Sequence, residues 1–312
     1  MKRFDRNTLS KLSLVLILVV ICVALAIFQP SFLKTTNIFN LLRTTSITGL
    51  IAIGMTVVII TGGIDLSVGS VVGISSVLCG ILMKQNGWPV GISLIVTIVI
   101  CLLIGLVNGL LIHYGKLPAF IATLGTMEMG RGLAMYITKG RTIPSLPQSF
   151  TGFAQLKILG LPSLFIVWVV VILLGFYILR FTRMGRNIYA VGSNMEAARL
   201  SGIKLAPTIC FCYMFNAFCA AIAGILLTAR ITSGQPSAGE GYEMTAIAAS
   251  VIGGASLAGA EGSAIGTVIG ACIMAVIQNG GNLLGINSFI MDIATGALVV
   301  IAVLIEKNKK RT

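Results

Sequence analysis

Residues 90–112 read VGISLIVTIVICLLIGLVNGLLI, an apolar run without a charged side chain. A helix that crosses a bilayer needs about 20 predominantly apolar residues, so this run is long enough to span. Similar runs recur along the rest of the chain. Inside a bilayer no water can pair with the backbone, and a helix satisfies its own amide and carbonyl groups. The stretch therefore predicts an all-α membrane protein.

The composition of the 312-residue chain agrees with lipid as its main solvent. Hydrophobic residues make up 56% and charged residues 10%, and the mean hydropathy is +1.01. So few charges cannot cover a globule of this size in water. The apolar residues also come in blocks instead of alternating with polar ones, which excludes an outer-membrane β-barrel.

The apolar runs predict a polytopic protein with about ten transmembrane helices, in a single transmembrane domain that covers residues 1–312. The second and third spans are separated only by the tetrapeptide GGID. We expect the ten spans at residues 12–28, 46–61, 66–83, 90–112, 119–137, 164–179, 208–229, 244–257, 263–279 and 289–305.

The net charge of +13 is better explained by membrane orientation than by nucleic acid. The basic residues lie between apolar spans, and Lys and Arg mark the cytoplasmic side of a membrane protein. With the N-terminus inside, they are about twice as frequent on inner segments as on outer ones. Ten spans place both termini and the loop 180–207 in the cytoplasm. This predicts a multi-pass protein of the bacterial inner (plasma) membrane with no nucleic-acid partner.

A short repeat suggests that the two halves are related. Residues 108–111 read NGLL and are followed by Phe-Ile at 120–121, while residues 279–284 read NGGNLL and are followed by Phe-Ile at 289–290. In the ten-span topology these segments lie on opposite sides of the membrane. An inverted repeat of five plus five helices would produce this arrangement.

The chain carries little of what an enzyme or a metal site needs. His113 is the only histidine, and the seven cysteines are scattered through apolar stretches as small core residues are. No Ser/His or paired-Asp constellation appears on neighbouring spans, so an intramembrane enzyme has no support. The only Gly-Lys dipeptide lacks the glycine pattern of a P-loop. We therefore expect no metal, no cofactor and no ATP hydrolysis in this chain.

Four stretches resemble the permease subunits of ribose-type monosaccharide ABC importers. They are residues 37–70, with NIFNLL, GMT and TGGIDLSVGS; residues 118–132, with PAFIATLG and RG; residues 185–203, with GRNIYAVG and EAARLSGI; and residues 253–259, with GGASLAG. The resemblance runs from about residue 37 to the C-terminus, and the order and spacing of the motifs make it specific.

This resemblance implies a function and a set of partners. Such permeases have about ten helices, work as homodimers surrounded by membrane lipid, and form the pathway for a monosaccharide such as ribose. Cytoplasmic ATP-binding-cassette ATPase subunits hold ATP and Mg, and an extracytoplasmic sugar-binding protein delivers the cargo. We expect the substrate pathway or its gate to involve Asp65, Ser67, Asn108 and Glu128.

The residues themselves leave some of these roles open. Asp65 and Ser67 lie in a glycine-rich segment between two spans, and unwound backbone at membrane depth lines a cavity or is buried in protein. Asp65 can cap the next helix, contact sugar hydroxyls or form part of a gate. Glu128 and Arg131 lie three residues apart on one apolar helix, a spacing that predicts an ion pair. A role of Glu128 in the pathway remains the other interpretation.

The loop 180–207 predicts a short surface helix that couples the permease to its ATPase. Ser193 or Asn194 suits the N-cap, Glu196 lies in the first turn, Arg199 lies near the end, and Gly202 suits the stop. Arg186 precedes this helix, and we include it among the ATPase-coupling residues. The alternative is a basic loop near anionic lipid.

One rival function remains at this stage, an ion-coupled secondary transporter of a small polar solute. In such a protein Asp65, Glu128 or Asp292 would bind the coupling ion.

Overall fold

The computed structural model describes the backbone from residue 6 to residue 309 and the side chains from 12 to 304. The described chain is mainly helical, as predicted. One short antiparallel hairpin joins β1 (Lys157–Ile158) to β2 (Leu161–Pro162). The α-helices are α1 Arg6–Phe28, α2 Thr35–Ile60, α3 Val68–Gly80, α4 Val90–His113, α5 Ala119–Thr138, α6 Gln148–Thr151, α7 Ser163–Phe181, α8 Arg183–Ser193, α9 Met195–Leu200, α10 Leu205–Ile231, α11 Tyr242–Ile252, α12 Ala264–Leu283 and α13 Ser288–Lys309.

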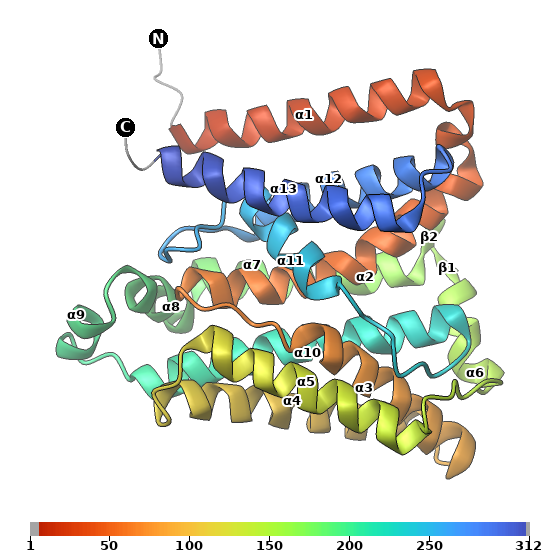
Figure 1. Cartoon of the computed structure of the whole chain (residues 1–312), viewed down its shortest axis with the longest axis horizontal. Coiled ribbons are helices and arrows are strands. Elements are labelled where there is room, and N and C mark those ends of the chain that lie inside the picture. Colours follow the sequence, from red (N-terminus) through yellow and green to blue (C-terminus); the bar gives the residue numbers. More distant parts are fainter. Residues whose placement is uncertain (1–5, 310–312) are drawn as a thin grey trace.

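Three short helical pieces complete the described chain. Two are 3₁₀ turns, at Pro30–Leu33 and Gly152–Gln155, and the third is a π-helix at Ile81–Gln85 that extends α3. The elements run roughly parallel to one another in a bundle (Figure 1).

Within the described residues, six helices are long and apolar enough to cross a membrane: α2, α3 with its π-helix, α4, α7, α10 and α12. Each overlaps one of the predicted spans. The apolar parts of α1, α11 and α13 are shorter. Helix α5 is outside this group because Glu128 and Arg131 lower its hydropathy. The chain is thus a polytopic α-helical membrane protein.

Two of the predicted boundaries that differ from the structure have a clear local cause. The sequence predicts the second span from residue 46, but α2 begins at Thr35, because the polar residues between 35 and 45 are also helical. The eighth predicted span reaches residue 257, but α11 ends at Ile252. Gly254, with φ +90°, turns the chain away from the helix there, a conformation that glycine adopts at little cost.

Two non-helical segments interrupt the bundle. Residues 61–67 leave the end of α2 and run into the bundle before α3 begins there. Residues 232–241 leave the end of α10 and enter from the opposite end before α11 begins (Figure 1). We call these segments the first break and the second break.

Helix α5 supplies hydrogen bonds to both breaks. The Thr123 hydroxyl donates to the Ile64 carbonyl in the first break (3.1 Å). The Arg131 guanidinium donates to the Pro236 and Ala238 carbonyls in the second break (2.8 and 3.0 Å). Non-helical backbone at membrane depth needs hydrogen-bond partners from the protein, because no water is present there to pair with its amide and carbonyl groups.

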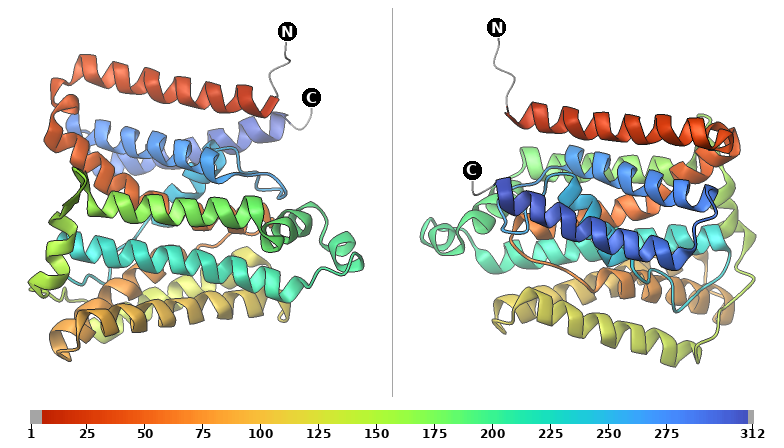
Figure 2. Two further views of the ribbon diagram at one scale, coloured as in Figure 1. Left: turned by 180° about the vertical axis from the view of Figure 1, so that it is seen from behind. Right: turned by 45° about the horizontal axis from the view of Figure 1, so that its top comes forward.

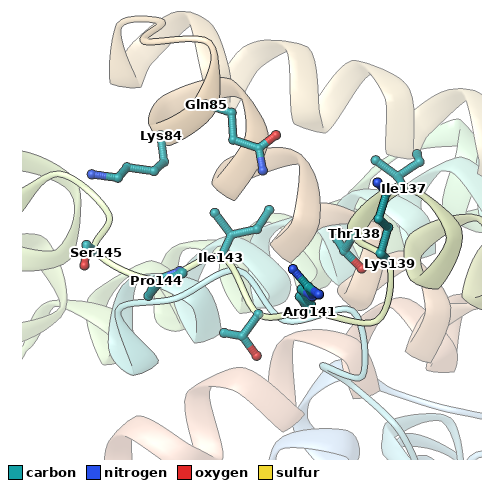
Figure 3. Close-up of a pocket in the computed structure, with 10 residues that line it drawn as sticks. Lys84, Gln85, Ile137, Thr138, Lys139, Arg141, Ile143, Pro144 and Ser145 are labelled. Carbon is teal, nitrogen blue, oxygen red and sulfur yellow. The ribbon is translucent and has the colours of Figure 1, made fainter.

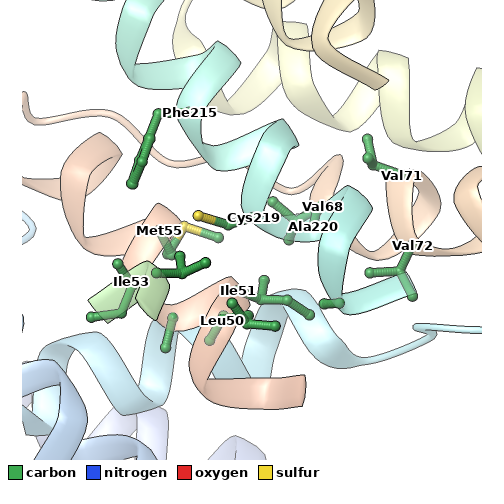
Figure 4. Close-up of a cluster of buried hydrophobic side chains, with 14 of the residues drawn as sticks. Leu50, Ile51, Ile53, Met55, Val68, Val71, Val72, Phe215, Cys219 and Ala220 are labelled. Carbon is green, nitrogen blue, oxygen red and sulfur yellow. The ribbon is translucent and has the colours of Figure 1, made fainter. Parts of the chain in front are cut away.

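The centre of the core is formed by α2, α3 and α10. Figure 4 shows apolar side chains from all three helices meeting there, among them Ile51 and Met55 from α2, Val68 from α3 and Phe215 from α10. Small residues allow the helices to approach one another closely. A Cβ at Gly105 of α4 would lie 2.8 Å from the Ala217 Cβ of α10.

The two ends of the bundle differ. The start of α1, the end of α13, and α8 with α9 lie at one end, and α6 and the hairpin lie at the other (Figures 1 and 2). Figure 2 shows α8 and α9 protruding beyond the long helices. The predicted cytoplasmic positions of the termini themselves, residues 1–5 and 310–312, lie outside the described residues.

Candidate functional site

Three of the four predicted pathway residues meet in one buried polar network. Asp65 and Ser67 come from the first break, and Asn108 comes from α4. Asn216 of α10 joins them and was missed from the sequence. Each of the four side chains is at most 1% exposed. We call this group the Asp65 network.

Three of the four hydrogen bonds in the Asp65 network end on the Asp65 carboxylate. Oδ1 accepts from the Ser67 amide (2.9 Å) and the Ser67 hydroxyl (2.6 Å). Oδ2 accepts from the Asn216 amide nitrogen (3.0 Å). The Asn108 amide nitrogen in turn donates to the Ser67 hydroxyl oxygen (2.9 Å). Such an arrangement stabilises an ionised carboxylate and ties the first break to α4 and α10.

The network combines a local turn before α3 with hydrogen bonds to neighbouring helices. The bond from the Ser67 amide to Asp65 closes a turn of the kind that Asp forms two residues before a helix start. The bond to Asn216 adds a contact that a local cap does not have. The amide oxygens of Asn108 and Asn216 are buried without a partner among the described residues. An unpaired buried acceptor costs about 1–3 kcal/mol, so this packed arrangement carries a local cost.

Glu128 does not join this group, and the predicted ion pair with Arg131 is wrong. Among the described side chains the only ion pair is between Arg199 and Glu196. Glu128 lies on an exposed part of α5. Arg131 turns instead to the carbonyls of the second break. Glu128 and Arg131 do lie three residues apart on one helix, as predicted. Their spacing could not show that backbone carbonyls of the second break lie beside α5 and bind Arg131.

The predicted surface helix is α9, and Asn194 is the one of its two N-cap candidates that the structure selects. The Asn194 side chain accepts a hydrogen bond from the Ala197 amide (2.9 Å), which makes it the N-cap. Gly202 adopts φ +83°, and the Ile203 amide bonds the Ala198 carbonyl in the pattern that ends many helices. The turn conformation that Gly202 adopts is open to glycine and strained for most other residues.

Glu196 and Arg199 form an exposed ion pair along α9. Hydrogen bonding from Arg199 lowers the pKa of the Glu196 carboxyl. An exposed pair of this kind contributes little to stability. Arg186 is also exposed but belongs to α8, so it is separate from the α9 group.

A backbone junction links α8 to the end of α2, directly before the first break. The Ala260 amide donates to the Ile60 carbonyl at the end of α2 (2.8 Å). Gly192, near the end of α8, leaves no room for a side chain, because a Cβ would overlap that same carbonyl oxygen. The Tyr189 hydroxyl, also from α8, donates to the Gly262 carbonyl (2.8 Å). We call this contact of α8, α2 and residues 259–262 the Gly192 junction.

The described residues contain no group of three His, Cys, Asp or Glu side chains that could hold a metal ion. The arrangement is instead one of buried ties between helices, two unwound segments at membrane depth and an exposed capped helix at one end.

Comparison with known proteins places the chain in a family. Residues 37–305 match the family model described as branched-chain amino acid transport system / permease component. The ribose import permease protein RbsC of Bacillus subtilis is 43% identical, over 98% of this chain and 95% of that protein. RbsC of Escherichia coli is 39% identical, over 96% and 94%.

A more distant relative also matches almost the whole chain. The xylose transport system permease protein XylH of Haemophilus influenzae is 34% identical, over 96% of this chain and 97% of that protein. No solved structure matches the chain. The polytopic helical fold and these full-length matches lead to one conclusion: this chain belongs to the family of ribose-type permease subunits of ABC importers.

Proposed function

We propose that this chain forms the translocation pathway for a monosaccharide, ribose or a related sugar, across the bacterial inner membrane. The family description names an amino-acid transport system, whereas relatives that match almost the whole chain are named for ribose and xylose. The full-length matches favour a sugar. The chain has no catalytic role in this proposal, and ATP and Mg are held by separate ATPase subunits. An extracytoplasmic binding protein delivers the sugar.

The observation that carries the proposal is the exposed face of α5. Glu128 lies near the middle of this helix, roughly 14 Å from either end at 1.5 Å per residue. Gly125 and Gly132 lie one turn away on either side, with open space where a Cβ would be. A carboxylate at such depth faces a wet cavity or protein and not lipid. We therefore place this face of α5 along the sugar pathway, enclosed by a second copy of the chain.

Substitution of Glu128 tests this assignment. We expect Glu128→Leu to lower sugar uptake at least tenfold, because loss of one hydrogen bond to a charged group changes affinity by about 1.5–3 kcal/mol. Glu128→Gln keeps a hydrogen-bonding group and should lose less. Folded yield should stay normal, since the side chain is exposed. Uptake into proteoliposomes and yield in detergent are the measurements.

Met129→Leu provides the matched control, because Met129 is 66% exposed on the adjoining apolar part of α5. It should leave uptake unchanged. Normal uptake and normal yield in Glu128→Leu would mean that this face of α5 lies outside the pathway.

The proposed topology has ten spans in two inverted halves, with both termini cytoplasmic. The two breaks enter the bundle from opposite ends, and each follows a long helix and precedes a shorter one. This order supports a pairing of α1–α5 with α7 and α10–α13. Each break together with its following helix then makes one discontinuous span, as in transporters with inverted repeats.

We propose that the loop 180–207 is cytoplasmic and that α9 docks on the ATPase. Arg186, Asn194, Glu196, Arg199 and Gly202 shape or present the docking surface. Three observations support this proposal. Helix α9 is capped at both ends, it protrudes from the bundle, and the adjacent α8 contacts the end of α2, directly before the first break, at the Gly192 junction. The alternative, an ion-coupled secondary transporter, receives no support from the relatives.

A further inference from the structure

A cationic hollow lies at the opposite end of the bundle from α9. It has a volume of about 470 Å³ and lies between the π-helix that extends α3, the end of α5 and the loop that follows α5. Figure 3 shows Lys84 and Gln85 on the π-helix, facing the segment from Ile137 to Ser145 across the hollow.

The floor of the hollow is fixed by backbone bonds. Ile143 is 6% exposed, and its amide and carbonyl both bond Gly234, at 2.8 and 2.9 Å. A Cβ at Gly80 of α3 would lie 3.0 Å from the Ile143 side chain, so the loop is packed against α3. The hollow is therefore a built feature of the surface.

Its charge is of one sign. Lys84, Lys139 and Arg141 line it, and no carboxylate does. All three are exposed, and none is in an ion pair with a described side chain. Lys139 also adopts a left-handed backbone conformation, with φ +53°, which glycine would adopt without strain. These features indicate a site for an anion.

The surroundings indicate where the anion comes from. Trp88 follows the π-helix and is 41% exposed. Exposed Trp and Tyr side chains gather at the level of the lipid headgroups. Helix α4 begins next to Trp88 and is highly apolar and mostly unburied, as a lipid-facing helix is. The hollow therefore lies at headgroup level, beside helices that contact acyl chains.

We propose that this hollow binds the phosphate group of an anionic phospholipid. Lys84, Lys139 and Arg141 would donate to the phosphate oxygens, while the acyl chains lie along α4. The inference goes beyond sugar transport and depends only on the membrane location of the chain.

The test uses the full-length chain in detergent, titrated with phosphatidylglycerol and followed by native mass spectrometry. One lipid per chain should bind more tightly than phosphatidylcholine does. The variant Lys84→Gln, Arg141→Gln should bind phosphatidylglycerol about 30-fold more weakly, since each basic residue near a membrane surface adds an attraction that corresponds to about fivefold in affinity. The matched control, Lys34→Gln with Lys157→Gln, removes the same charge outside the hollow and should bind as the unmodified chain does.

A second variant separates binding from folding. Lys139→Gly removes a charge but keeps a residue suited to φ +53°, so it should weaken lipid binding about fivefold without lowering thermal stability. Equal lipid affinity in the variant Lys84→Gln, Arg141→Gln and in its control would overturn the proposal. So would displacement of the lipid by millimolar inorganic phosphate, which would indicate a free-anion site. A pocket variant that keeps its lipid but no longer docks the sugar-binding protein would identify a protein contact instead.

Discussion

Exchanging the acid and the amide of Asp65 and Asn216 should restore a protein that either single substitution damages. Asp65→Asn places an amide nitrogen where Oδ2 accepts from Asn216, so two donors face each other. Asn216→Asp places a second carboxylate beside Asp65 in a buried site. Loss of a hydrogen bond to a charged group costs about 1.5–3 kcal/mol, and two buried like charges cost more. We expect a large loss of folded yield and of uptake in both single variants.

The double variant Asp65→Asn, Asn216→Asp should recover most of the yield. The amide oxygen introduced at position 65 could still accept from the Ser67 amide and hydroxyl, and the new amide nitrogen would donate to the carboxylate introduced at position 216. Thermal stability in detergent and sugar uptake in proteoliposomes are the two measurements. If the double variant were no more stable than the worse single variant, the hydrogen bond between Asp65 and Asn216 would not be the contribution of Asp65 to stability. Recovery of folding without recovery of uptake would favour a direct role of the carboxylate in the pathway.

A side chain at Gly192 should uncouple ATP hydrolysis from the sugar-loaded binding protein. Gly192→Val pushes α8 away from the Ile60 carbonyl, because no space exists for a Cβ there. Overpacking of this kind costs about 1–3 kcal/mol. The docking surface of α9 is unchanged, so the ATPase should still associate. Stimulation of hydrolysis by sugar-loaded binding protein should fall at least tenfold, because movement of α8 no longer reaches the first break.

Two comparison variants make this result specific. Gly152→Val is the matched control, since Gly152 has ordinary helical dihedrals and open space around its Cβ position. It should keep full stimulation. The reversal Glu196→Lys with Arg199→Glu changes the exposed surface of α9 and should weaken ATPase association instead. Full stimulation in Gly192→Val would show that the junction transmits nothing.

The sequence predicted the features that depend on local pattern. Apolar length identified the spans represented by α4 and α10. The capping signals located the start of α9 to one of two residues and its end at Gly202. Both kinds of signal act within one helix. A helix cap or an apolar run is determined by neighbours in the chain, so no knowledge of the fold was needed.

The features that the sequence did not predict depend on contacts between distant segments. Asn216 is one of several polar residues in a mostly apolar helix. None of its neighbours in the chain indicates that it bonds Asp65, 151 positions earlier. The partner of Arg131 lies 105 positions later, in backbone that reads as an ordinary loop. Polar residues inside predicted spans were the available signal. They indicate that a partner exists without identifying it.

The most direct test of the proposed function is reconstitution of the chain in proteoliposomes, alone and with its partners. We expect no sugar uptake by the chain alone, with or without an ion gradient. Uptake should appear when the cognate ATPase, ATP with Mg and the sugar-binding protein are all present, and should stop when any one is omitted. Accumulation of sugar by the chain alone, abolished by collapse of an ion gradient, would contradict the proposal that this chain is the permease subunit of an ATP-driven importer.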